Sequence, residues 1–143
     1  MSHADLLREW YSEVWENGNT DAIDQYFAPE ALAEGLIPEM QVGADDFRDL
    51  VMAFRHILGD IQVDMPKIIE NGDWVSAIIH LRTTRADNGA PLQATGSVMG
   101  RIKNGRMVEA YNQFDFISLF EQLGQFPQDT LPVCMTGQRL DWA

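Results

Sequence analysis

Cysteine, long apolar runs and basic residues are all scarce in this chain. Its single cysteine, Cys134, excludes an internal disulfide framework and fits a reducing compartment. No apolar run reaches the roughly 18 residues of a transmembrane helix, and residues 1–11 lack the basic and apolar regions of a secretory signal. We therefore expect a cytoplasmic protein that does not enter the membrane.

Basic residues are outnumbered by acidic ones, 10 Lys and Arg against 22 Asp and Glu, which gives a net charge of −12. The phosphate groups of nucleic acids and of anionic membranes would repel such a chain, so both are excluded as partners. The 3 histidines show no metal-ligand spacing with one another or with Cys134, and there is no phosphate-cradling loop. We expect no metal and no cofactor.

The hydrophobic content, 45% of 143 residues, suffices for one buried core, so residues 1–143 are expected to form a single domain. Apolar residues recur at helical spacing in three segments, 3–17, 20–28 and 43–59. In the first segment the apolar stripe comprises Leu6, Leu7, Trp10, Tyr11, Val14 and Trp15. Segment 30–42 is expected to be irregular or a short strand.

From residue 60 onward the apolar pattern changes to a period of two, as in β-strands. Four extended runs, 60–70, 73–86, 92–103 and 106–118, are separated by the turn sequences NGD, DNG and NGR, which favour hairpins. Helices followed by an antiparallel meander predict an α+β fold, whose curled sheet leaves a concave face for the helices to cover. Residues 125–143 are expected to form an irregular tail.

Hairpin turns set the register, and the register decides which side chains share a face of the sheet. A two-residue turn at 104–105 places Ser97 opposite Asn112, and the preceding turn places His80 near Ser97. One face is then largely polar and carries Ser76, Ile78, His80, Arg82, Thr95, Ser97, Met99, Arg101 and Asn112. The other face is mostly apolar and carries Val75, Ala77, Ile79, Leu81, Ala94, Val98, Ile102, Met107 and Tyr111.

Two interpretations of these faces stay open. In the first, the apolar face packs against the helices and the polar face meets water, as in many antiparallel sheets. In the second, the polar face lines an internal pocket and the apolar face is buried against a second subunit. Asp115 has the opposite parity to Asn112, so both enter one pocket only if the strand bulges between them.

These two polar residues interrupt an otherwise apolar stretch, EAYNQFDFISLFEQLG, at 109–124. Together with the three helices and the segment ENGNTDAIDQYFAPEA at 16–31, it resembles the SnoaL-like polyketide cyclases of the nuclear transport factor two-like superfamily. The matching positions near the last strand are Gly105, Arg106, Met107, Val108, Glu109, Tyr111, Asp115, Gln122, Leu123 and Gly124. The resemblance covers residues 5–124. It implies a cone-shaped α+β barrel, with three N-terminal helices on a curved antiparallel or mixed sheet that often pairs into a homodimer.

The resemblance also implies cofactor-independent acid/base chemistry on a small apolar or aromatic molecule that carries oxygen. Asp115 matches the aspartate that serves these cyclases as general acid and base. Asn112, His80 and Tyr11 are the candidate catalytic partners, which would orient the substrate and stabilise an oxyanion. The rest of the substrate pocket is assigned to Trp15, Glu34, Phe54, Met99, Arg101 and Tyr111.

The chain departs from the cyclases on the strand at 96–105, which has no histidine and carries Arg101 near that place. Tyr11 matches the oxyanion-binding tyrosine of the related ketosteroid isomerases, but their catalytic aspartate would fall at Gly35. The Asp-Arg-Asp group of limonene epoxide hydrolases is replaced by His80, Ile78 and Asn112. No complete catalytic set of a known member is therefore present.

Three functions follow from these observations. The first is a cyclase, isomerase or hydrolase that uses Asp115. The second is a non-catalytic ligand-binding or dimerisation module, and the third is a partner-regulated protein that docks another polypeptide on its apolar sheet face. Each candidate residue also has a structural explanation. Asp115 could cap the following turn, Asn112 could satisfy a bulge, and His80 and Tyr11 could belong to the packed interior.

Overall fold

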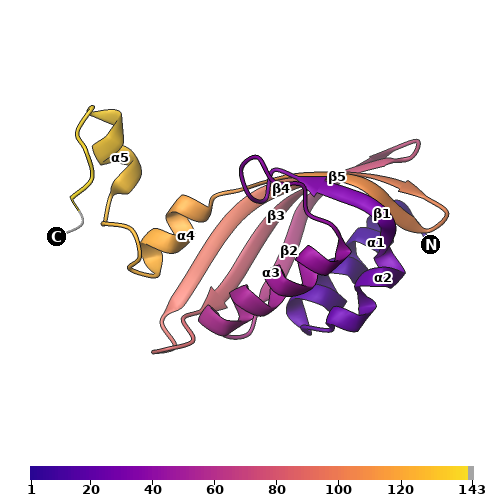
Figure 1. Cartoon of the computed structure of the whole chain (residues 1–143), viewed down its shortest axis with the longest axis horizontal. Coiled ribbons are helices and arrows are strands. Elements are labelled where there is room, and N and C mark those ends of the chain that lie inside the picture. The colour runs from indigo at the N-terminus through magenta and orange to yellow at the C-terminus, as the bar shows by residue number, and fades with distance from the viewer. Residues whose placement is uncertain (142–143) are drawn as a thin grey trace.

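The structure is a computed structural model that describes residues 1–141, in which a curved five-stranded sheet wraps around N-terminal helices (Figure 1). The elements in chain order are α1 (His3–Trp10), π-helix η1 (Tyr11–Glu16), 3₁₀-helix η2 (Thr20–Ala22), α2 (Ile23–Tyr26), β1 (Phe27–Glu34), α3 (Ala44–Ile57), β2 (Gln62–Asn71), β3 (Trp74–Thr84), β4 (Pro91–Lys103), β5 (Arg106–Phe114), α4 (Phe116–Gln122) and α5 (Thr130–Met135). The α+β prediction is confirmed. No helix within residues 1–141 combines the length and the apolar character needed to cross a membrane.

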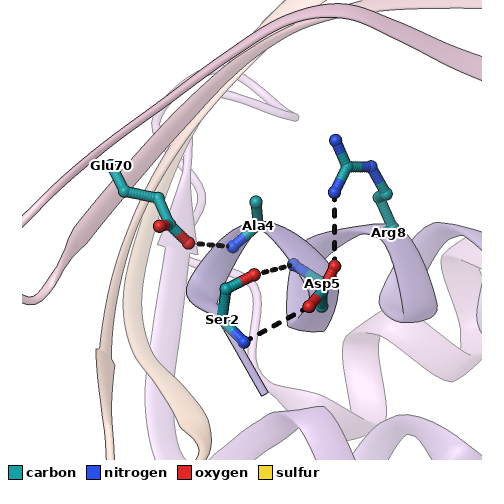
Figure 2. Close-up of polar contacts among 5 residues, drawn as sticks. All are labelled: Ser2, Ala4, Asp5, Arg8 and Glu70. Atoms are coloured by element: carbon teal, nitrogen blue, oxygen red, sulfur yellow. Dashed lines mark hydrogen bonds and ion pairs between the residues drawn. The ribbon is translucent and has the colours of Figure 1, made fainter.

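Helix α1 begins with a capping box, and a further hydrogen bond joins its first turn to β2, an edge strand of the sheet (Figure 2). Asp5 N–H donates to Ser2 Oγ at 3.0 Å, and Ser2 N–H donates to the Asp5 carboxylate at 3.4 Å. The Glu70 carboxylate on β2 accepts from Ala4 N–H, one of the amides that a helix leaves unpaired in its first turn. The start of α1 is thereby fixed by its own side chains and by a contact across 66 positions of sequence.

The first helix is not continuous over 3–17 as predicted. At Tyr11 the chain changes to the π-helix η1, in which Asn17 N–H donates to the Ser12 carbonyl at 2.9 Å. A π-turn holds one more residue than an α-turn, and such turns occur frequently at functional sites. This turn carries Tyr11 and Trp15, both of which return in the site described below.

The sheet order is β1-β5-β4-β3-β2, and β2 to β5 form the predicted antiparallel meander. Strand β1 was foreseen only in part, because 30–42 was expected to be irregular or a short strand and 20–28 was expected to be helical. It pairs in parallel with β5, which makes the sheet mixed. Pairing between positions about 80 residues apart leaves no local pattern in the sequence (Phe27 pairs with Met107).

A β-bulge at Val108 corrects the predicted face of the last strand. Ile102 pairs with Met107 as expected, but Arg101 pairs with Glu109, so Val108 is the extra residue. Beyond this bulge every side chain of β5 changes face. Asn112 therefore lies opposite Val98 on the apolar face, and Tyr111 lies opposite Met99 on the polar face.

The apolar face of the sheet packs against the helices, so the first of the two interpretations is confirmed and the second is wrong. Val75 and Ile79 are fully buried in one cluster with Leu7, Trp10 and residues of α3. His80 pairs with Thr95 instead of lying near Ser97, a shift of two positions that leaves it on the same outer face. The concave side of the sheet is thus the apolar side.

Strand β5 ends at Phe114, whereas the sequence predicted an extended run to residue 118. Asp115 caps α4 instead, since its carboxylate accepts from Ser118 N–H at 3.0 Å. The expected irregular tail contains one further helix, α5, which stands away from the sheet and the N-terminal helices (Figure 1). Residues 142–143 of that tail lie outside the described residues.

Candidate functional site

A cavity of about 60 Å³ lies between the concave face of the sheet and the helices. Its helical side is formed mainly by Leu7, Trp10, Tyr11, Trp15, Phe47 and Phe54. Its sheet side is formed mainly by Leu81, Val98, Met107, Ala110, Asn112 and Phe114, and Phe116 and Leu119 of α4 complete the wall. Within residues 1–141, the side chains of this wall that carry polar groups are Tyr11, Asn112 and the indoles of Trp10 and Trp15.

The Tyr11 side chain is 6% exposed, and no hydrogen bond joins its hydroxyl to another residue within 1–141. No side-chain oxygen or nitrogen within 1–141 is both fully buried and without a partner, so the Tyr11 hydroxyl oxygen keeps contact with the open space of the cavity. Burial raises the pKa of Tyr11 far above its usual value of 10.0, because the apolar surroundings disfavour the phenolate. The phenol therefore stays protonated at neutral pH and can donate a hydrogen bond into the cavity.

Asn112 is 7% exposed and reaches the cavity because the bulge at Val108 turns it inward. Its Nδ2 donates to the Glu34 backbone carbonyl at 3.4 Å, a long hydrogen bond across the end of β1. No residue within 1–141 donates a hydrogen bond to the Asn112 side-chain carbonyl oxygen. The amide lines both the cavity and a groove on the other side of the sheet, and its carbonyl can still accept a hydrogen bond.

Aromatic rings from η1, α3, β5 and α4 meet at the end of the cavity near α4. Phe54 and Phe116 stack with centroids 5.5 Å apart and planes at 21°, and Phe114 stacks on Phe116 at 5.7 Å. Trp15 meets Phe54 edge-on at 6.1 Å, and Phe120 stacks on Phe54 at 6.4 Å. All five rings are half-buried, and all but Phe120 line the cavity.

Comparison with known proteins agrees with this architecture. The family model of the SnoaL-like polyketide cyclases matches residues 5–123. The chain belongs to the SnoaL-like polyketide cyclase family. No curated protein matches the sequence.

Solved structures share the nuclear transport factor two-like fold of this SnoaL-like chain. IdmH from Streptomyces antibioticus, proposed to be a polyketide cyclase, is 20% identical over 85% of this chain and 97% of its own, with a TM-score of 0.75. AclR from Streptomyces galilaeus, proposed to be a hydroxylase, is 18% identical over 94% and 88%, with a TM-score of 0.76. A protein with a ketosteroid isomerase-like fold from Catenulispora acidiphila, solved with trimethylamine, is 14% identical over 86% and 95%, with a TM-score of 0.73. Identities this low show the fold alone.

In this SnoaL-like chain the cavity brings together four of the residues selected from the sequence. Tyr11 and Asn112 supply its polar groups, and Trp15 and Phe54 supply part of its aromatic wall. The other two proposed catalytic residues are elsewhere. Asp115 is exposed and caps α4, and His80 is exposed on the outer face of the sheet. The prediction that Asp115 faces the chamber is therefore wrong for this conformation.

Four residues assigned to the pocket, Glu34, Met99, Arg101 and Tyr111, lie on the outer side of the sheet and do not line the SnoaL-like cavity. Arg101 Nε donates to one Glu109 carboxylate oxygen at 2.5 Å, and the Tyr111 hydroxyl donates to the other at 2.6 Å. The Tyr111 hydrogen bond, followed by the one from Arg101, lowers the pKa of Glu109. These side chains form a polar cluster on the convex surface.

Sequence reasoning did not assign α4 to the site, because 106–118 reads as one extended run. The spacing of Phe116, Leu119 and Phe120, three and four positions apart, is a helical signal that would have found it. Within residues 1–141 no group of three or more His, Cys, Asp or Glu side chains is placed to hold a metal ion. The chemistry of the described cavity is therefore that of an aromatic chamber with one phenol and one amide.

Proposed function

We propose that this SnoaL-like protein binds an apolar or aromatic small molecule that carries an acceptor oxygen, with the oxygen held by the Tyr11 hydroxyl. The observation that carries the proposal is a tyrosine only 6% exposed, whose hydroxyl has no partner within 1–141 and opens onto the cavity in a mostly apolar wall. A ligand oxygen would satisfy this donor, and an apolar body would fill the aromatic chamber. The Asn112 amide offers a second polar contact.

The size of the cavity implies that the ligand enters by displacing part of the wall. At about 60 Å³ it is smaller than the cavity of about 150 Å³ that accommodates benzene in an engineered protein. The part proposed to move is the Phe116 side chain, which closes the aromatic stack at the start of α4. Gln122 of the same helix exchanges two hydrogen bonds with the Gln93 backbone of β4, so we expect Phe116 to turn outward while α4 stays on the sheet.

A matched pair of ligands tests the role of Tyr11. Acetophenone and α-methylstyrene have nearly the same shape, but only acetophenone carries an acceptor oxygen. We expect the protein to prefer acetophenone by about five- to tenfold in an NMR titration, the contribution of about one hydrogen bond. Tyr11→Phe should abolish this preference and leave α-methylstyrene binding nearly unchanged.

Tyr26→Phe is the matched control, since Tyr26 is also a buried tyrosine of the helical layer but does not line the cavity. It should keep the wild-type preference. Equal affinity of the wild type for the two ligands, or an unchanged preference in Tyr11→Phe, contradicts the proposal.

Catalysis is a second candidate function, favoured by the position of Asp115 and by the family. Its chain neighbours Phe114 and Phe116 both line the cavity, whereas the carboxylate itself is exposed and caps α4. Loss of its hydrogen bond from Ser118 N–H would free the side chain to turn towards the cavity. The carboxylate could then remove a proton from the carbon next to a ligand carbonyl, while Tyr11 donates to the enolate oxygen and the proton is later returned.

Asp115→Asn separates this chemistry from folding, because asparagine caps helices as well as aspartate does. We expect the wild type to accelerate exchange of the acetophenone methyl protons for deuterium in D₂O, followed by NMR. Asp115→Asn should lose about 100-fold or more of that acceleration, the usual contribution of a general base. Equal exchange rates in the two proteins rule out Asp115 as the base.

A further inference from the structure

Arg55 follows the cavity-lining Phe54 on α3 and reaches the C-terminal end of η1. Its Nη1 donates to the backbone carbonyl oxygens of Trp15 and Glu16, each at 3.1 Å. The loop that follows is shaped around the guanidinium group. Gly18 has φ of +67°, and a Cβ atom there would lie 2.5 Å from Arg55 Nε. Arg55 therefore links α3 to the end of the π-helical turn.

The end of η1 needs such a partner for two reasons. The last carbonyl groups of a helix accept no hydrogen bond from an N–H group of the same helix, and they carry partial negative charge. A guanidinium group satisfies them with charge-assisted hydrogen bonds. On the other side of the turn, Glu16 Oε2 accepts from Val63 N–H of β2 at 2.9 Å. Two contacts thus hold this uncommon helical form between α3 and the sheet.

We propose that Arg55 is a positioning residue that holds Trp15 as an aromatic wall of the cavity and so favours aromatic over alicyclic ligands. The proposal rests on the proposed function, since it concerns the same chamber. Trp15 supplies one of the two carbonyls that Arg55 binds, and its indole lines the cavity against Phe54. Without Arg55 the turn can relax from the π to the α hydrogen-bond register. An α-turn is completed with one residue fewer, which corresponds to a rotation of about 100° and would turn the Trp15 side chain out of the wall.

The test compares acetophenone with cyclohexyl methyl ketone, which share the carbonyl group and differ in the ring. We expect the wild type to prefer acetophenone by about fivefold, the size of one aromatic pair contact. Arg55→Met should reduce this preference to about one, while the preference for acetophenone over α-methylstyrene, which reports Tyr11, is kept. Arg55→Lys retains a cationic donor for the carbonyls and should recover most of the ring preference.

Arg48→Met is the control on the same helix, because Arg48 forms ion pairs with Asp24 and Asp45 and does not contact η1. It should behave as the wild type. In a Trp15→Leu background, Arg55→Met should cause no further change in ring preference. Wild-type ring preference in Arg55→Met, no recovery in Arg55→Lys, or a further loss in the Trp15→Leu background each overturns the proposal. Failure of the proposed function is seen separately, as the absence of any preference for acetophenone over α-methylstyrene.

Discussion

At the scale of single residues, Gly35 decides how closely the end of β1 approaches β5. Its φ is +89°, and a Cβ atom added there would lie 1.9 Å from the Asn112 backbone carbonyl oxygen. We expect Gly35→Ala to lower the free energy of unfolding by more than about 2 kcal/mol, because left-handed strain alone costs about 1–2 kcal/mol and the backbone contact adds to it. Urea unfolding measures the difference.

Gly72 provides the control for that substitution. It also has a positive φ, +60°, but nothing lies within 4 Å of an added Cβ. Gly72→Ala should therefore show the strain alone, about 1–2 kcal/mol. Equal losses at the two glycines would mean that the close approach of β1 to β5 is not a constraint.

Individual site residues were predictable where a short-range pattern places them. Tyr11, Trp15 and Phe54 belong to helical stripes, whose inward face follows from spacing within each segment. Asn112 was predicted in the pocket, but the strand face assigned to it was wrong because one extra residue at Val108 reverses the alternation. Asp115 was placed inside on the resemblance to the cyclases, whereas its structural alternative, the cap of the following turn, is what the structure has.

At the scale of elements, the N-terminus of α1 gives the fold a pH-dependent contact (Figure 2). Hydrogen bonding to Ser2, chiefly through its side chain, lowers the pKa of Asp5 below its usual value of 3.8. A carboxylate with a lowered folded-state pKa contributes stability above its unfolded pKa, and loses it as the pH falls through the folded value. The capping box should therefore weaken only in acid, below about pH 4.

Ser2→Ala should lower the free energy of unfolding by about 1 kcal/mol near neutral pH, the usual effect of losing an N-cap. The difference from wild type should shrink at about pH 2, where the Asp5 partner is protonated in both proteins. Urea unfolding at the two pH values is the measurement. Ser97→Ala, which removes an exposed hydroxyl from β4, is the control and should show no such pH dependence. A pH-independent loss in Ser2→Ala contradicts the argument.

Elements with local signals were predicted, and those that depend on distant contacts were not. Helix α3 and the hairpins of β2 to β5 follow from spacing and Asn-Gly turns within each segment. Strand β1 exists because β5 offers an edge to it, a partner about 80 positions away that no window of sequence contains. The π-register of η1 likewise depends on contacts with Arg55 and β2, so the sequence predicted an ordinary helix there.

At the scale of the whole molecule, the outer face of the sheet is the surface best suited to a second copy. Ile78, Met99 and Tyr111 are exposed there, and Met99 lies directly opposite Tyr111 on the neighbouring strand. Met99 and Tyr111 line a shallow groove together with Glu34, Ser76, Ser97 and Gln113, so these apolar side chains have polar neighbours, as in many interfaces. The opposite, apolar face of the sheet, which carries Val75 and Ile79, is covered by the helices and cannot contact a second copy.

We therefore expect a homodimer, which light scattering after size-exclusion chromatography would detect as twice the chain mass of 16.2 kDa. Met99→Glu places a charge at the centre of the face and should shift the protein to monomer. Met52→Glu is the control, since Met52 is an exposed methionine on α3, outside the sheet. Each copy carries a net charge of −12, so salt should strengthen the association by screening their repulsion. A monomer at every salt concentration, or equal dissociation by both substitutions, would remove the outer face as the interface and leave Ile78, Met99 and Tyr111 exposed on a single chain.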